Sequence, residues 1–126
     1  MTPIMIDASA WIELIEGTEL GRRVQKYLDD CDCLTSSLTV AEVCSKARRK
    51  GNYEEAAFQS MTTTDIIPLT GEIAKTAGML HAYHHEKNSK FSMGDAVILA
   101  TARKLGAKIL TKDTDFRNIP EAILLK

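Results

Sequence analysis

The stretch SMGDAVILATA, residues 92–102, carries the most informative pattern in the sequence. Ser92 is a favourable N-cap residue, and the apolar residues that follow it run almost around a helix. Gly106 stands at a position where many helices end. The pattern predicts a helix from Met93 to Leu105 that is buried between two layers and carries one carboxylate, Asp95, in its first turn.

Short apolar runs elsewhere in the chain predict strands. They are Ile4–Ile6, Cys33–Thr35, Ile66–Leu69, Lys108–Thr111 and Ala122–Leu125. Pro68 favours a sheet edge or a strand end for the third run. Helical spacing of apolar residues marks the segments 8–15, 19–30, 39–51, 53–61 and 70–87. Strands alternating with helices predict a three-layer α/β/α sandwich around a central, mainly parallel sheet.

Length and composition are typical of one globular domain spanning residues 1–126. Sixteen Lys and Arg against seventeen Asp and Glu give a formal net charge of −1, which excludes a strongly basic protein that coats nucleic acid. Three cysteines without a CxxC motif favour a reducing compartment. We find no signal-peptide pattern and no apolar run long enough to span a membrane, so we expect a cytoplasmic protein without membrane partners.

Four carboxylates fall where a parallel sheet places its binding sites, at the carboxyl ends of the strands. Asp7 follows the first strand and Asp113 follows the fourth, while Glu42 and Asp95 stand near the starts of two helices on the same side. Clustered carboxylates repel one another unless a divalent cation holds them. Oxygen ligands without nearby His or Cys suit Mg²⁺ or Mn²⁺.

Each carboxylate also has a purely structural explanation. Asp7 fits the N-cap of the first helix, and Glu42 fits a capping box with Thr39. Asp95 complements the helix dipole, and the acidic residues after the fourth strand suit a turn. These separate explanations do not account for the joint placement of the four side chains at one edge.

Four segments, taken in order, resemble the PIN-domain ribonucleases, and most closely the VapC toxins of prokaryotic toxin–antitoxin pairs. They are IDAS (residues 6–9), LTVAEV (38–43), SMGDAVILATA (92–102) and ILTKDTDF (109–116). The resemblance spans Ile4 to Leu125. The short segments are common by themselves, but the ordered set with this spacing is specific.

The resemblance implies a metal-dependent endoribonuclease that hydrolyses RNA phosphodiester bonds with one or two Mg²⁺ or Mn²⁺ ions. It implies the toxin of a type II toxin–antitoxin pair, which binds a small cognate antitoxin and forms a homodimer. The residues that match the family's acidic quartet, and are expected to be catalytic and to bind metal, are Asp7, Glu42, Asp95 and Asp113. Asp115 matches an accessory acidic position. Ser9 and Thr111 match small hydroxyl positions that line such sites, and Lys112 is a candidate for substrate contact.

Other functions stay open at this point. A PIN-fold nuclease that processes RNA or cleaves DNA flaps would have the same site, although such relatives usually carry added domains. A non-catalytic binding relative would be expected to have lost members of the acidic set, and none is lost. A receiver domain needs a phosphoacceptor aspartate after a middle strand, whereas the run Ile66–Leu69 is followed by Thr70.

Two further clusters have ordinary explanations. The basic residues of Lys46–Lys50 suit the C-terminal end of a helix, and the alternative is phosphate contact beside the metal site. His81 and His84 are one helical turn apart but have no evident acidic or thiol partner, so we expect a surface or interface role. Trp11 has the spacing of a core residue.

Overall fold

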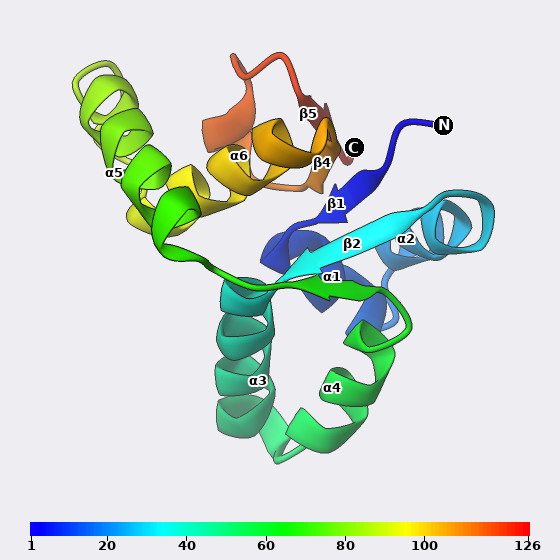
Figure 1. The fold of residues 1–126 in the computed structure, drawn as a ribbon. Helices are drawn as coiled ribbons and strands as arrows, with labels where there is room; N and C mark the ends of the chain where they lie inside the picture. Colours follow the sequence, from blue (N-terminus) through cyan, green and yellow to red (C-terminus); the bar gives the residue numbers. More distant parts are fainter.

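Five short parallel strands form a twisted sheet at the centre of the structure, a computed structural model that describes residues 1–126 (Figure 1). The strands are β1 (Ile4–Ile6), β2 (Cys33–Ser36), β3 (Asp65–Ile67), β4 (Lys108–Thr111) and β5 (Ala122–Leu124). Their order across the sheet is β3-β2-β1-β4-β5, and all four neighbouring pairs are parallel. β3 lies at an edge, as Pro68 predicted.

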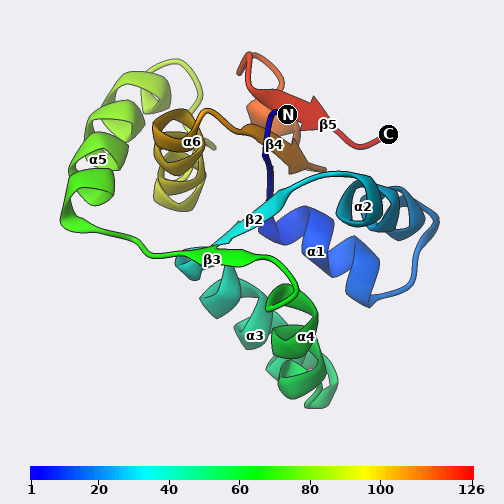
Figure 2. The same ribbon diagram turned by 45° about the vertical axis from the view of Figure 1, so that its right-hand side comes forward.

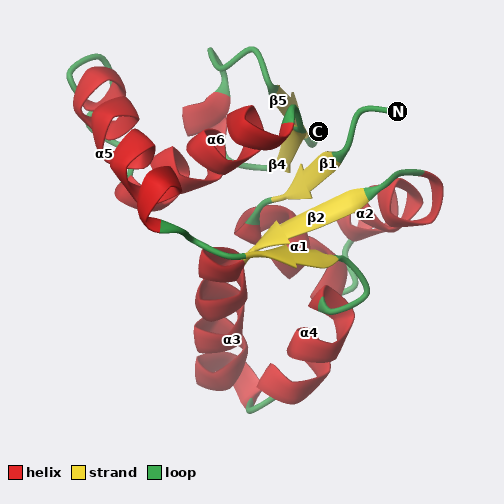
Figure 3. Cartoon of the chain, in the orientation of Figure 1, coloured by secondary structure: helices red, strands yellow, loops and turns green.

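Six α-helices and one short 3₁₀-helix cover the sheet (Figure 3). They are α1 (Ala8–Ile15), α2 (Glu19–Asp30), α3 (Ser37–Gly51), α4 (Glu54–Met61), α5 (Gly71–His85), α6 (Met93–Leu105) and η1 (Thr114–Phe116). Helices α1 to α4 lie on one side of the sheet and α5 and α6 on the other (Figure 2). The predicted three-layer α/β/α sandwich is confirmed. No helix is long and apolar enough to cross a bilayer.

Alternation along β1 explains why the core has two parts. Ile4 and Ile6 face the α1–α4 side and pack with Trp11, whereas Met5 faces the opposite side and packs against α6. Successive side chains of a strand point to opposite faces, so a sheet that is apolar on both faces must be covered on both. Trp11 is fully buried, as its spacing predicted, and its indole N–H donates to the Thr35 hydroxyl.

Helix α6 has the predicted bounds, from Met93 to Leu105, and seven of its residues, Ala96 to Ala102, are buried. Ser92 caps it, and Gly106 ends it with a φ of 64°, the left-handed conformation that glycine adopts without strain. At α3 the N-cap is not Thr39, the residue that the sequence suggested. There the N-cap is Ser36, whose hydroxyl accepts a hydrogen bond from the Leu38 amide.

The expected capping box of Thr39 with Glu42 is therefore wrong. The extended chain of β2 continues to Ser36, so the helix begins before Thr39. Thr39 lies inside the helix and is buried, and its hydroxyl has no hydrogen-bond partner. Capping consequently offers no explanation for the position of Glu42, which lies in the second turn of α3.

Candidate metal centre

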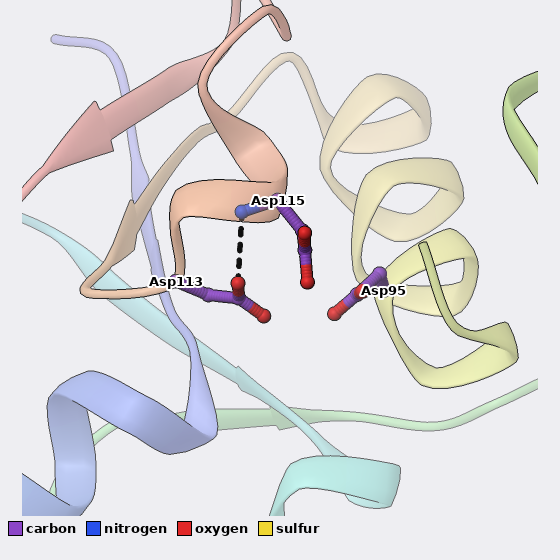
Figure 4. A group of neighbouring side chains, drawn as sticks. All are labelled: Asp95, Asp113 and Asp115. Atoms are coloured by element: carbon purple, nitrogen blue, oxygen red, sulfur yellow. Dashed lines mark hydrogen bonds between the residues drawn. The ribbon is translucent and has the colours of Figure 1, made fainter. Parts of the chain in front are cut away.

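Three carboxylates from two segments of the chain converge beyond the carboxyl end of β4. Asp95 comes from the first turn of α6, and Asp113 and Asp115 come from the segment that follows β4. Each offers one oxygen, and these atoms all lie within 4.8 Å of one another. Figure 4 shows the three side chains directed toward a common space. No other group of three or more His, Cys, Asp or Glu side chains in the chain has this spacing.

The start of α6 orients Asp95 through a capping box. The Asp95 amide donates to the Ser92 hydroxyl at 3.1 Å, and Asp95 Oδ2 accepts from the Ser92 amide at 2.9 Å. The structural explanation of Asp95 as a helix-terminal carboxylate is thus correct, and its side chain also points toward Asp113 and Asp115 (Figure 4). Capping and a role in the site are compatible here.

Asp113 and Asp115 are oriented by a local turn and by one long-range contact. Asp113 Oδ1 accepts from the Asp115 amide at 2.9 Å, which is the turn geometry that the sequence suggested. Asp115 Oδ1 accepts from the side-chain amide of Asn88, in the loop between α5 and α6, at 3.2 Å. Sequence reasoning missed Asn88, because nothing in its local pattern distinguishes it from an ordinary loop residue.

Asp7 lies at the end of β1 and is only 7% exposed. Asp7 occupies the N-cap position of α1, as the sequence suggested, but its side chain makes no capping hydrogen bond to the helix. Instead, Asp7 Oδ2 accepts from the Thr111 hydroxyl at 2.8 Å and from the Ser9 hydroxyl at 3.1 Å. Two donors compensate the buried charge, and they leave the second oxygen of Asp7 without a protein partner.

The candidate substrate-contact residues are tied to this network. The Thr111 hydroxyl accepts from the Asp113 amide at 3.0 Å, and the Ser9 hydroxyl accepts from the Lys112 amide at 2.9 Å. Thr111 is fully buried. The Lys112 ammonium pairs with Glu13 of α1, at 3.2 Å. In this arrangement Ser9 and Thr111 position Asp7 and the segment after β4.

Glu42 approaches the centre from α3. A Cβ atom built on Gly94 would lie 3.2 Å from Glu42 Oε2, so the carboxylate rests against the start of α6 and Gly94 leaves room for it. Although much of the residue is exposed, burial of its carboxyl group raises the pKa, and the charges of Asp7 and Asp95 raise it further. Glu42 is therefore close enough to Asp7 and Asp95 for their negative charges to affect its ionisation.

The centre is anionic, and no cationic side chain neutralises its carboxylates. Burial raises the pKa of Asp95 to about 6, with further contributions from Asp113 and Asp7. Burial also raises the pKa of Asp113, and the charges of Asp115 and Asp7 act in the same direction. No Lys or Arg forms an ion pair with any of these carboxylates. An all-oxygen, anionic donor set fits a hard divalent cation.

The raised pKa of Asp95 predicts a pH dependence of stability in the metal-free protein. Because its pKa rises from 3.8 to about 6 on folding, the folded state binds the proton more tightly than the unfolded chain. The free energy of unfolding in EDTA should therefore fall by about 1 kcal/mol between pH 4 and pH 7, after allowance for solvent screening. Urea unfolding at several pH values measures it. Asp95→Asn should flatten this slope, and equal slopes for both proteins would contradict the assignment.

The remaining clusters lie outside the centre. Within the basic stretch of α3, Arg48 pairs with Glu54 and Lys50 with Glu16, which favours the ordinary explanation over phosphate contact for these two. The ring of His81 stacks on His85, and His84 packs on Phe91. A cavity of about 420 Å³ is lined by residues of α1 and α2 and by residues near the starts of β2 and β3, and its lining includes none of the five carboxylates.

Comparisons with known proteins identify one matching family and several structures with the same fold. The PIN domain family model matches residues 4–122. A toxin–antitoxin complex from Klebsiella pneumoniae superposes with a TM-score of 0.83 at 24% identity, covering 98% of both chains. VapBC2 from Rickettsia felis, bound to a DNA fragment from its promoter, has a TM-score of 0.76 at 16% identity, covering 98% of this chain and 97% of that one.

A third similar structure is VapC20 from Mycobacterium tuberculosis, described as a toxin that cleaves the sarcin–ricin loop. It has a TM-score of 0.75 at 20% identity and covers 93% of this chain and 95% of that one. No curated protein sequence matches the chain significantly. At these identities the structures establish a common fold.

Proposed function

This chain belongs to the PIN-domain family, and we propose that it is a divalent-metal-dependent endoribonuclease and the toxin of a type II toxin–antitoxin pair. The observation that carries the proposal is the convergence of Asp95, Asp113 and Asp115 within reach of one cation. Asp7 and Glu42 flank them and add two further carboxylates.

The carboxylates would hold Mg²⁺ or Mn²⁺ through Asp95, Asp113 and Asp115, with Asp7 and Glu42 completing the site. When bound, such a cation lowers the pKa of a water molecule and stabilises charge on a phosphodiester. The protein itself supplies placement: the Ser9 and Thr111 hydroxyls hold the Asp7 carboxylate in position, and Asp113 or Asp115 is available to orient the attacking water. Ser9 and Thr111 donate their protons to Asp7, so neither hydroxyl is poised as a nucleophile.

The proposal is tested by incubating the purified chain with RNA and Mn²⁺ and by sequencing the 5′-phosphate ends that form in cells after its induction. Hydrolysis of this kind leaves a 5′-phosphate and a 3′-hydroxyl. Growth arrest with cleavage at a few sites supports a toxin. Cleavage without growth arrest would instead favour an RNA-processing nuclease, and absence of cleavage with both Mg²⁺ and Mn²⁺ would refute the enzyme.

We propose that the antitoxin silences the site with a positive charge. Five clustered carboxylates attract a guanidinium group, which matches carboxylates with paired hydrogen bonds. An arginine placed among Asp7, Asp95 and Asp113 would compete with metal for the same oxygens.

Metal should therefore weaken antitoxin binding by the same factor by which antitoxin weakens metal binding. At 100 times the metal dissociation constant, the antitoxin should bind up to about 100-fold more weakly. Titration of the toxin with antitoxin at rising Mn²⁺ and constant ionic strength measures this. An affinity independent of metal would mean that the antitoxin covers the RNA path without entering the centre.

A homodimer is part of the same proposal. Met79 and Tyr83 lie one turn apart on α5 and are more than half exposed, which gives this helix an apolar stripe. Light scattering of the purified chain should then give twice the 13.9 kDa mass of one chain. A mass of one chain at high protein concentration would contradict it.

A further inference from the structure

The segment that carries Asp113 and Asp115 contacts α1 through Lys112. One of its partners there, Glu13, has no role in the chemistry proposed above. Ser9 and Glu13 are four residues apart on α1 and therefore share one face of the helix. Ser9 Oγ accepts from the backbone amide of Lys112 at 2.9 Å, and Glu13 Oε2 accepts from the Lys112 ammonium at 3.2 Å. One face of α1 thus holds Lys112 by both its backbone and its side chain.

Glu13 is itself held firmly. Its side chain is only 12% exposed, and its Oε1 accepts from the Thr18 hydroxyl at 2.8 Å. The hydrogen bond from Thr18 holds the pKa of Glu13 below its usual value, and Lys112 and Lys46 act in the same direction, so Glu13 is ionised at neutral pH. Thr18 is the N-cap of α2, where its oxygen accepts from the Gly21 amide. Glu13 is therefore an anchored acceptor at the junction of α1 and α2.

The position of Lys112 determines how the centre is assembled. It is the single residue between Thr111, at the end of β4, and Asp113. The next fixed points of the chain are the Asp113 carboxylate, which accepts from the Asp115 amide, and the ring of Phe116, which is fully buried. Between β4 and Phe116, Lys112 provides the side-chain link to α1.

We propose that Glu13 is a positioning residue: its ion pair with Lys112 holds the segment from Lys112 to Phe116 so that Asp113 and Asp115 face Asp95. This inference rests on the proposed function in so far as these carboxylates bind metal. A phosphate contact needs an available cation, whereas the Lys112 ammonium is bound to a more buried carboxylate. Lys112 therefore helps to hold the metal ligands in position.

The test compares Glu13→Gln, Lys112→Met and Lys112→Arg with a matched control, Glu16→Gln. Glu16 also pairs with a lysine, Lys50, but that pair does not involve the segment after β4. We expect Glu13→Gln and Lys112→Met each to weaken Mn²⁺ binding and to lower kcat by about three- to tenfold, the range of one partly buried ion pair.

The KM for RNA in these variants should stay within about twofold of the wild-type value, because the ion pair does not contact the substrate. The double variant should be no worse than either single variant, because both remove one interaction. Lys112→Arg keeps a cation opposite Glu13 and should therefore retain more kcat and Mn²⁺ affinity than Lys112→Met, whereas Glu16→Gln should behave as the wild type. Calorimetric titration with Mn²⁺ and initial-rate kinetics give these quantities.

Two outcomes would overturn the inference. If Lys112→Met raises KM while kcat and Mn²⁺ affinity stay unchanged, and Glu13→Gln has no effect, Lys112 contacts substrate phosphate. If Glu13→Gln leaves Mn²⁺ affinity and kcat unchanged, the ion pair does not position the ligands.

Hydrogen exchange separates this inference from the proposed function. In the metal-free protein, amides from Lys112 to Phe116 should exchange faster in Glu13→Gln and Lys112→Met than in the wild type or in Glu16→Gln. That result would support the positioning role of the ion pair even if the wild-type chain cleaved no RNA, which would refute the nuclease alone. Unchanged exchange in both variants would contradict the positioning role, whatever the activity.

Discussion

Replacing Asp95 with asparagine is expected to reduce RNA cleavage by about 100- to 1,000-fold, the loss typical of a group that stabilises charge in a transition state. Helix α6 should be retained, because the asparagine carbonyl can still accept from the Ser92 amide, as Asp95 Oδ2 does. The melting temperature in EDTA should not fall and should rise slightly at neutral pH, because the substitution removes a partly buried charge whose pKa is raised to about 6. Cleavage assays and thermal unfolding of the same preparation separate the two effects.

Glu42→Gln provides the complementary variant. Because α3 is capped by Ser36, Glu42 has no capping role, and a loss of activity reports on its charge at the centre. Asp29→Asn is a suitable control, since Asp29 lies near the C-terminal end of α2 and bonds only to Gln25. We expect the control to keep wild-type activity. Full activity in both Asp95→Asn and Glu42→Gln would refute the centre.

Removal of divalent metal is expected to abolish cleavage, and metal binding is expected to stabilise the fold. The carboxylates around Asp95 lack cationic side-chain partners, so a bound cation relieves their mutual repulsion. At a Mn²⁺ concentration 100 times its dissociation constant, linkage predicts a gain of roughly 2.7 kcal/mol in the free energy of unfolding. For a chain of this size the melting temperature should rise by about 10 °C.

Differential scanning fluorimetry with Mn²⁺ and with excess EDTA measures the shift. Asp95→Asn, purified in the same way, serves both as the metal-binding control and as the control for contaminating nucleases. The variant should show a much smaller shift and the same loss of cleavage, about 100- to 1,000-fold. Undiminished wild-type cleavage in excess EDTA, with the variant impaired to this extent, would rule out a metal-dependent mechanism.

The layers of the fold, and the edge of the sheet where the centre lies, could be predicted from local sequence patterns. Each strand contains a short apolar run, and α6 begins and ends beside residues with strong local preferences, Ser92 and Gly106. Such signals act within a few residues, so they are readable without the rest of the chain. They failed at α3, because Ser36 and Thr39 are both good N-cap residues and only the length of β2 decides between them.

The hydrogen-bond partners of the polar side chains could not be predicted in this way, because they depend on how the elements pack. This packing brings Asp115, expected as an accessory position, within reach of Asp95 and Asp113, and it commits the hydroxyls of Ser9 and Thr111 to Asp7. The bond between Thr111 and Asp7 joins residues 104 positions apart. It exists because β1 and β4 are neighbours in the sheet.

The contacts of Lys112 with Glu13 and of Asp115 with Asn88 have the same origin. Hydrogen bonds and ion pairs act over a few ångströms and depend on direction. The residues that pair in this way are therefore determined by the order of the strands and the packing of the helices, and they cannot be predicted from the local sequence.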